Sequence, residues 1–242
     1  MSTDFDRRQF LGVTGLAAAG LIASVDLESG SAHAQTTPTT GGPRMAYEIK
    51  PMPFNPSGIK GLSEKILVSH YENNYSGAVK RLNAIGTQLA ELDFAKAPVF
   101  MVNGLKREEL IAMNSMILHE VYFDSLGGGG SPNGALANAI KRDFGSVDRW
   151  RTEFSAMGRA EGGGSGWVIL AYSPRDKRLL NQWAADHTTT LAGGRPILVL
   201  DMYEHAYHMD YGAKAAAYVD VFMEAIHWEN ATKQYDRVSR ES

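Results

Sequence analysis

Cysteine is absent from all 242 residues of the chain. Its absence excludes a disulfide framework and any metal site built from thiolates. A transition metal, if the chain binds one, must therefore be held by imidazole and carboxylate groups.

A strong charge of either sign is also missing. The formal net charge is −3, and residues 1–34 carry two arginines against four acidic residues, so that removing them leaves −1. A nearly neutral chain argues against nucleic acid as the main partner. The length suits one large domain or two small ones, with room for a sizeable core.

The first 34 residues have the order of an export signal. Arg7 and Arg8 precede a weakly apolar run rich in Gly and Ala, which ends in AHA before Gln35. This order is typical of a signal peptide, and RRQFLG is its twin-arginine form. The alternative is an ordinary hydrophobic N-terminal helix; the run is too short and glycine-rich for a membrane span. We expect a periplasmic or secreted product, exported by the twin-arginine route, with no membrane association after signal removal.

The next part of the chain predicts a linker and two helices. Residues 35–62 are rich in Pro, Thr and Gly, which indicates a flexible linker followed by an extended arm. A helix is predicted over residues 63–92, with Ser63 as N-cap and with His70, Asn74 and Ala78 on one stripe. A second helix is predicted over residues 106–125. Residues 63–130 should thus form a helical hairpin domain.

The periodicity of the hydrophobic residues changes in residues 131–242. Two short helices are followed by the apolar runs WVILAYS, RLLNQWA and PILVLD, which predict three strands, and the segment AAAYVDVFMEAIHWENATKQY predicts one closing helix. Helices, then strands, then a helix indicate an α+β fold. We expect an N-terminal helical hairpin domain followed by a metal-binding domain with a three-stranded antiparallel sheet and flanking helices.

Several polar residues occur where burial is expected. Asp201 ends the third strand and His205 follows four residues later, while His70 and His119 lie within the predicted helices. A lone histidine is more often a satisfied core or surface residue, but a buried unpaired imidazole or carboxylate is costly. Three imidazoles and one carboxylate that converge on a divalent metal would satisfy all four. Such a set favours iron or manganese, although zinc also accepts these ligands.

The segments that contain these residues resemble the iron/manganese superoxide dismutase family. DMYEHAYHMDY resembles the family signature D-x-W-E-H-A-Y-Y-x-D-Y, GGGSGW resembles its glycine-serine-glycine-tryptophan segment, and FGSVDRWRTEF resembles the preceding helix. The resemblance covers roughly residues 63–228. It implies that superoxide is the substrate and that one iron or manganese per chain, with a solvent molecule as fifth ligand, is held by His70, His119, Asp201 and His205. It also implies a homodimer, with a tetramer as the alternative, in which Glu204 reaches His205 of the partner subunit.

The resemblance extends to the group that hydrogen-bonds the bound solvent. In the family this partner is usually glutamine; Ser115 occupies its position in many iron forms, and His187 aligns with its position in many manganese forms. His187 is our candidate, with a surface loop histidine as the alternative. An imidazole near its ordinary pKa would make activity depend steeply on pH.

Other positions depart from the family pattern. Asn74 and Ala78 stand where the family has a histidine and a gateway tyrosine, and Tyr75 is a candidate replacement for that tyrosine. His208 replaces a further tyrosine, so the family's contact across the dimer would here join Asn74 and His208. Tyr203 replaces the signature tryptophan, and Phe123 stands where an aromatic wall residue is expected.

These departures leave three functions open. A superoxide dismutase is the leading one. The alternatives are another metal-dependent oxidoreductase or peroxidase on the same site, and a non-catalytic metal-binding protein that keeps the fold.

Overall fold

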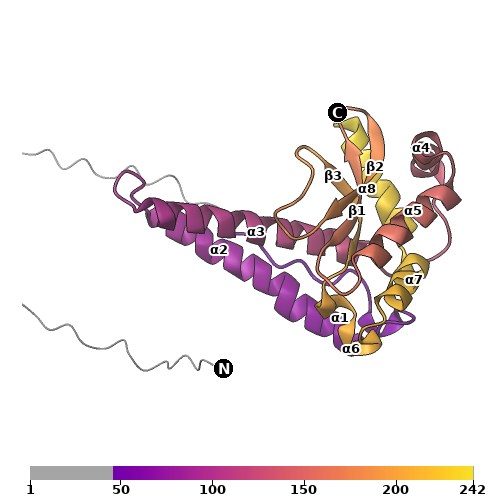
Figure 1. Ribbon diagram of the computed structural model, residues 1–242, viewed down its shortest axis with the longest axis horizontal. Helices are drawn as coiled ribbons and strands as arrows, with labels where there is room; N and C mark the ends of the chain where they lie inside the picture. The colour runs from indigo at the N-terminus through magenta and orange to yellow at the C-terminus, as the bar shows by residue number, and fades with distance from the viewer. Residues whose placement is uncertain (1–45, 242) are drawn as a thin grey trace, which may run out of the picture. The chain divides into compact units, whose positions relative to one another are not determined.

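The computed structural model describes residues 46–241, which lie within one compact unit (Figure 1). The predicted signal peptide and the first part of the predicted linker lie outside the described residues. None of the helices in the described part is long and apolar enough to cross a membrane.

The arm that precedes the first helix runs along that helix. The side chain of Asn83 bonds both the backbone N–H and the carbonyl of Tyr47, at 2.8 and 2.9 Å. Lys50 donates its N–H to the Tyr75 hydroxyl, and the Tyr71 hydroxyl donates to the Lys50 carbonyl. A short 3-10 turn, Pro56–Gly58, then leads into the helix.

The first helix is continuous but contains a π turn that the sequence pattern did not predict. It consists of α1 Glu64–Ser69, the π segment His70–Tyr75 and α2 Ser76–Glu91, and the Ser63 side chain accepts the Ile66 N–H as predicted. The π turn inserts one extra residue between buried positions. Tyr75 therefore joins His70 in the interior, whereas Asn74 stays half-exposed, so the predicted stripe is interrupted at Asn74 and resumes at the buried Ala78.

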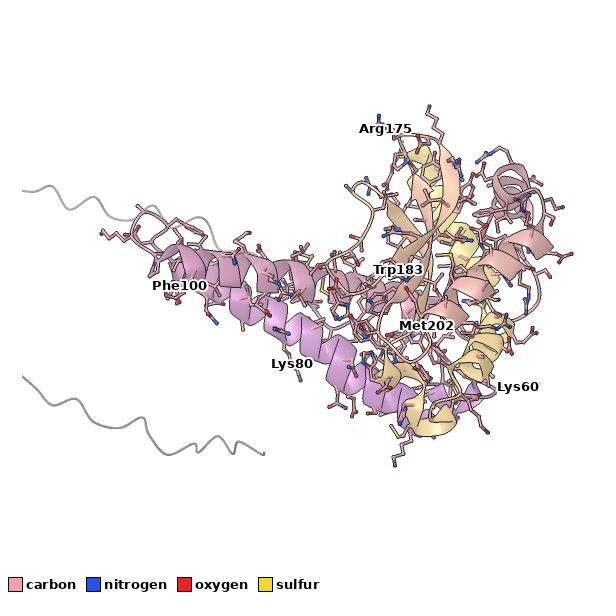
Figure 2. All side chains as sticks on the ribbon, in the orientation of Figure 1. Lys60, Lys80, Phe100, Arg175, Trp183 and Met202 are labelled. Carbon is pink, nitrogen blue, oxygen red and sulfur yellow. The ribbon has the colours of Figure 1, made fainter. Side chains whose placement is uncertain are left out.

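The second helix, α3, spans Val99–Asp124 and begins well before the predicted Lys106. The hydrophobic pattern did not predict the first turns of α3, because Val99, Phe100 and Met101 are apolar yet exposed. Figure 2 shows Phe100 at the end of the α2–α3 hairpin that lies away from the sheet, and Met202 within the body of the unit.

The second half has the predicted helices and sheet. Helices α4 Gly134–Phe144 and α5 Val147–Ala160 precede strands β1 Trp167–Ser173, β2 Arg178–Ala184 and β3 Arg195–Asp201. The strands are antiparallel in the order β2-β1-β3, and β1 is buried along its whole length. The α+β prediction is confirmed.

The closing segment is two helices rather than one. After the short η3 Glu204–Ala206 and α6 His208–Tyr211, the chain forms α7 Ala215–Ala225 and α8 Trp228–Arg240. The break occurs because Ile226 is extended and pairs with Leu126 at the end of α3. Ser125, beside Leu126, accepts the His227 N–H through its carbonyl and the Val199 N–H through its hydroxyl, which joins α3 to β3.

Candidate metal centre

The packing of α3 against β3 brings the four predicted ligands to one point. His70 opens the π segment, His119 lies in the last turns of α3, Asp201 ends β3 and His205 lies in η3. The Nε2 atoms of His70, His119 and His205 lie 3.1, 3.6 and 3.2 Å from the Oδ2 atom of Asp201. Ligand atoms from all four residues lie within 4.8 Å of one another.

Local hydrogen bonds direct the ligand atoms toward this point. The carbonyl of Ser115 can only accept, so the 2.6 Å contact with His119 places the proton of that ring on Nδ1 and leaves the Nε2 lone pair free. The Tyr203 N–H donates to Oδ1 of Asp201 at 2.8 Å, which leaves Oδ2 as the free oxygen. Both ring nitrogens of His70 and the Nε2 of His119 are buried without a hydrogen-bond partner among the described residues.

The donor set and its charge fit a first-row divalent ion. Metal–ligand distances of about 2.0–2.2 Å place atoms that share one ion about 3–4 Å apart. The three distances from Nε2 atoms to Oδ2 of Asp201 lie in this range. Burial lowers the pKa of His70 and lowers that of His119 to about 3, so both rings are neutral. Burial opposes ionisation of Asp201, but the His205 and His70 rings hold its pKa below the ordinary value. One buried negative charge beside the two neutral imidazoles of His70 and His119 calls for a cation.

Aromatic rings pack around the ligand side chains. Trp167 meets His119 edge-on at a centroid distance of 5.1 Å, and Phe123 lies 5.2 Å from His70, where a wall residue was expected. Tyr203, in place of the family tryptophan, stacks on His205 at 5.3 Å. These contacts restrict ring rotation and keep the site apolar.

His187 lies beside this cluster, in the loop between β2 and β3. Its Nδ1 accepts the indole N–H of Trp167 at 3.0 Å, and its ring stacks on Tyr203 at 4.9 Å. Its ring centroid lies 6.2 Å from that of His119. Burial lowers the pKa of His187 below its ordinary value.

A cavity of about 340 Å³ opens onto three of the imidazoles. It is lined by α2, α3 and the imidazoles, namely Asn73, Asn74, Gly77, Ala78, Arg81, Ile111, Ala112, Ser115, His119, His187 and His205. Ala78 and Gly77 leave the α2 side open where the family has a tyrosine. The cavity gives a small ligand access to His119 and His205.

Tyr75 does not line this cavity. Its hydroxyl accepts the Lys50 N–H at 2.9 Å and donates to Glu120 at 3.1 Å, and its ring packs on Phe123. The π turn points it into this network, which does not support the suggestion that Tyr75 replaces the gateway tyrosine.

The predicted interface residues are accessible in the single chain. Glu204 and His208 are exposed, and Asn74 lines the cavity. His205 is the one of the four ligand candidates with an accessible part, since 27 % of its side chain is exposed.

Sequence reasoning missed three residues near the site. Asn114 donates to the His187 carbonyl, Arg81 lines the cavity, and Glu161 is a buried acid at the end of α5. None belongs to a motif; only the charge of Glu161 directly before a glycine run could have drawn attention.

The chain is similar to superoxide dismutases over most of its length. Residues 132–234 match the family described as iron/manganese superoxide dismutases, C-terminal domain. Over 197 residues the chain is 70 % identical to "Superoxide dismutase [Fe]" of Cupriavidus metallidurans, which covers 81 % of this chain and 100 % of that protein. It is 32 % identical to "Superoxide dismutase [Mn] 1" of Halobacterium salinarum, covering 80 % and 96 %, and 33 % identical to "Superoxide dismutase [Fe]" of Aquifex pyrophilus, covering 77 % and 90 %.

Proposed function

The chain belongs to the iron/manganese superoxide dismutase family, and on this premise we propose which residues hold its metal and where the enzyme works. It converts superoxide to hydrogen peroxide and oxygen at an iron or manganese site. The proposed ligands are His70, His119, Asp201 and His205. The observation that carries the assignment is the convergence of three Nε2 atoms on Oδ2 of Asp201.

Of the two metals, we propose iron as the native one. The relative with 70 % identity is named as an iron enzyme, whereas the manganese enzymes among the relatives are about one-third identical. The bound ion supplies the electron exchange, through which two superoxide ions and two protons become one hydrogen peroxide and one oxygen molecule.

The protein side chains determine the charge of the metal site, the access of superoxide to it and the position of the proton on His187. The Asp201 carboxylate offsets cationic charge, and the neutral imidazoles add none. His187 accepts from Trp167 through Nδ1, so its neutral ring carries the proton on Nε2 and can donate it at the cavity. His187 is therefore the proposed hydrogen-bond donor beside the reacting atoms, and the cavity above Ala78 is the path for superoxide.

A homodimer is the proposed working state. The family premise pairs Glu204 with His205 of the partner subunit. In the single chain Glu204 is exposed, and the Nδ1 atom of His205 has no hydrogen-bond partner within the described residues. A carboxylate that accepts a hydrogen bond from that nitrogen would hold the ring and raise its basicity. The exposure of both residues supports this contact.

Export by the twin-arginine route is proposed from residues 1–34. This route carries folded proteins, which suits a metal inserted before transport. Replacing Arg7 and Arg8 with Lys should leave the product in the cytoplasm, as measured by cell fractionation; unchanged export would contradict the signal assignment.

Metal loading tests the ligand assignment. Protein loaded with iron or manganese should hold about one ion per chain and dismutate superoxide. Asp201→Ala should lose the metal, because a missing carboxylate leaves the charge of the ion uncompensated in a buried site. Asp148→Ala, an exposed aspartate on α5, is the matched control. Full metal content in Asp201→Ala would overturn the assignment.

A further inference from the structure

We propose that a row of three tyrosines carries oxidising equivalents from the metal centre to the surface of the protein. The tyrosine row consists of Tyr122, Tyr218 and Tyr211, and it begins beside the ligand candidate His70. None of the three is a ligand candidate, and none lines the cavity. The inference rests on the proposed metal site, because the oxidation starts there, but it adds a function that dismutation itself does not require.

The first two members of the row connect His70 to the interior. The ring of Tyr122, on α3, lies 5.0 Å from the His70 ring between centroids. Its hydroxyl accepts a hydrogen bond from the hydroxyl of Tyr218, on α7, at 3.3 Å. Both side chains are fully buried, so this pair of hydroxyls is shielded from water.

The last member of the row reaches the surface. The Tyr211 ring lies 6.4 Å from the Tyr218 ring between centroids, and Tyr211 ends α6 and is partly exposed. On its other face the Tyr218 ring carries the buried Tyr207, stacked at 5.2 Å with an interplanar angle of 21°. A stacked electron-rich ring stabilises a neighbour that has lost an electron. Each step of the row is thus a contact between adjacent side chains, and the last one is open to solvent.

The chemistry of the side chains favours this route over a second row of rings. That second row leads from Tyr122 through Phe222 and Phe154 to Trp150. A phenol gives up an electron far more easily than a phenyl ring, because the neutral phenoxyl radical is delocalised over ring and oxygen. Electron tunnelling slows steeply with distance, so short steps between oxidisable rings are faster than one long step across two phenylalanines.

Hydrogen peroxide, the product of dismutation, is the oxidant. It takes up two electrons and two protons, its O–O bond breaks, and two water molecules form. One electron comes from iron(II), which becomes iron(III), and the other comes from Tyr122. Tyr122 also gives up its phenol proton as one of the two that are consumed, and it is left as a neutral radical.

The radical then moves outward along the row. At the hydroxyl pair, an electron and a proton pass together from Tyr218 to the Tyr122 oxygen, so no charge is left in the apolar interior. When an electron from Tyr211 refills Tyr218, the proton returns across the same hydrogen bond, and Tyr122 recovers a proton from water at the metal centre. The Tyr211 proton leaves to solvent. In sum, iron(II), the Tyr211 phenol, one peroxide and one proton give iron(III), the Tyr211 radical and two water molecules.

This transfer removes the oxidant from the side chains that the site depends on. Trp167 and Tyr203 pack directly on the ligand candidates His119 and His205 and would be oxidised by an equivalent that stayed at the metal. A small one-electron donor from solution, such as ascorbate, restores the phenol at Tyr211 by giving it one electron and one proton.

The radical can be detected without measuring dismutation. Iron-loaded protein that is mixed with hydrogen peroxide and rapidly frozen should show the electron paramagnetic resonance spectrum of a tyrosyl radical. In a parallel sample a nitroso spin trap should attach to Tyr211, as located by mass spectrometry of peptides. Zinc-loaded protein should show neither signal, because zinc has no redox chemistry.

Phenylalanine variants test the order of the row. Tyr218→Phe should keep a radical on Tyr122 and lose the adduct on Tyr211, and Tyr211→Phe should keep a buried radical and lose the surface adduct. Metal content should not change, because Tyr122, the member in contact with His70, is kept. Tyr211→Phe changes a partly exposed residue and keeps the test decisive if Tyr218→Phe does not fold.

Tyr235→Phe is the matched control, because Tyr235 is a buried tyrosine on α8 that packs on Tyr172 instead of on the row. Repeated additions of hydrogen peroxide should inactivate Tyr218→Phe and Tyr211→Phe sooner than the wild type and this control. Ascorbate should protect the wild type and should not protect Tyr211→Phe.

Three results would overturn the inference. They are the absence of a protein radical in the iron-loaded wild type, an adduct on Tyr211 that persists in Tyr218→Phe, and an equal adduct in the zinc-loaded protein. An adduct confined to Trp167 and Tyr203 would also contradict it. Loss of metal binding or of dismutation in the wild type would instead count against the proposed function.

Discussion

Among the described residues that line the cavity, Arg81 is the single arginine or lysine. It lies one turn beyond Ala78 on α2 and forms an ion pair with Glu108 of α3. Superoxide is an anion, and a cationic group at an open cavity raises its local concentration and its on-rate. The loss of the tyrosine that would stand at Ala78 leaves Arg81 in direct reach of an entering ligand.

Arg81→Gln should therefore lower kcat/KM about threefold to tenfold at low ionic strength, and added salt should shrink the difference. The measurement is kcat/KM against ionic strength for this variant, the wild type and Arg149→Gln, which alters an exposed arginine on α5. A loss that does not depend on salt would contradict guidance by charge.

Glu161 is a second residue whose surroundings decide its chemistry. The residue is 7 % exposed, and neither carboxyl oxygen makes a hydrogen bond of normal geometry within the described residues. The carboxyl packs against Gly166, where a Cβ atom would lie 3.0 Å from it. Burial raises the pKa to about 8, and the backbone of Ala184 opposes this rise only in part.

This raised pKa predicts that stability falls with pH. Between the ordinary pKa of 4.5 and about 8 the folded state keeps a proton that the unfolded state releases, so the free energy of unfolding decreases as pH rises through this window. The loss is on the order of 4 kcal/mol. Glu161→Gln should remove it and be more stable than the wild type at pH 8.

Chemical denaturation from pH 5 to pH 9 measures the difference. Glu224→Gln, which changes an acid with a 78 % exposed side chain, is the control and should follow the wild type. Parallel curves for Glu161→Gln and the wild type would show that Glu161 ionises normally.

Among the elements, the first helix is joined most directly to the signature segment. Ser63 caps α1 by accepting the Ile66 N–H, and its own N–H and hydroxyl donate to the two carboxylate oxygens of Asp210, each at 2.7 Å. The Tyr211 hydroxyl also donates to the Gly61 carbonyl. The start of the helix that carries His70 is thus bonded to the segment that follows His205.

Ser63→Ala should cost about 1 kcal/mol of unfolding free energy through loss of the cap. Metal content should stay near the wild-type value, because the ligand atoms themselves keep their partners. Thermal unfolding and metal analysis measure both quantities, with Ser57→Ala in the preceding turn as control. Full stability in Ser63→Ala would show that the cap is dispensable.

In the proposed dimer, metal retention would be coupled to assembly of the subunits. A hydrogen bond from a ligating imidazole to a carboxylate is worth roughly 1.5–3 kcal/mol, and two-fold symmetry makes two of them. Glu204→Ala should therefore weaken the dimer and lower metal retention together.

Light scattering over a range of protein concentrations, combined with metal analysis, tests this coupling. Glu229→Ala, which changes an exposed acid on α8, should behave as the wild type. A Glu204→Ala protein that remains dimeric and keeps its metal would refute the contact.

The strands and the identity of the converging residues could be predicted from the sequence alone. WVILAYS and PILVLD become buried strands, as is typical of short apolar runs that are bounded by turns. Asp201 and His205 were identified because polar residues at the end of such a run need partners. The two residues are four positions apart, so their proximity can be read directly from the sequence.

The contacts between distant segments could not be predicted in this way, because they depend on tertiary packing. The π turn at His70 moves Tyr75 inward, the pairing of Ile226 with Leu126 breaks the closing helix, and Asn114 meets the His187 carbonyl from another element. None of these leaves a periodic pattern, because each depends on backbone groups brought together by packing. The proton position on His187 follows in the same way from the register that places Trp167 beside it.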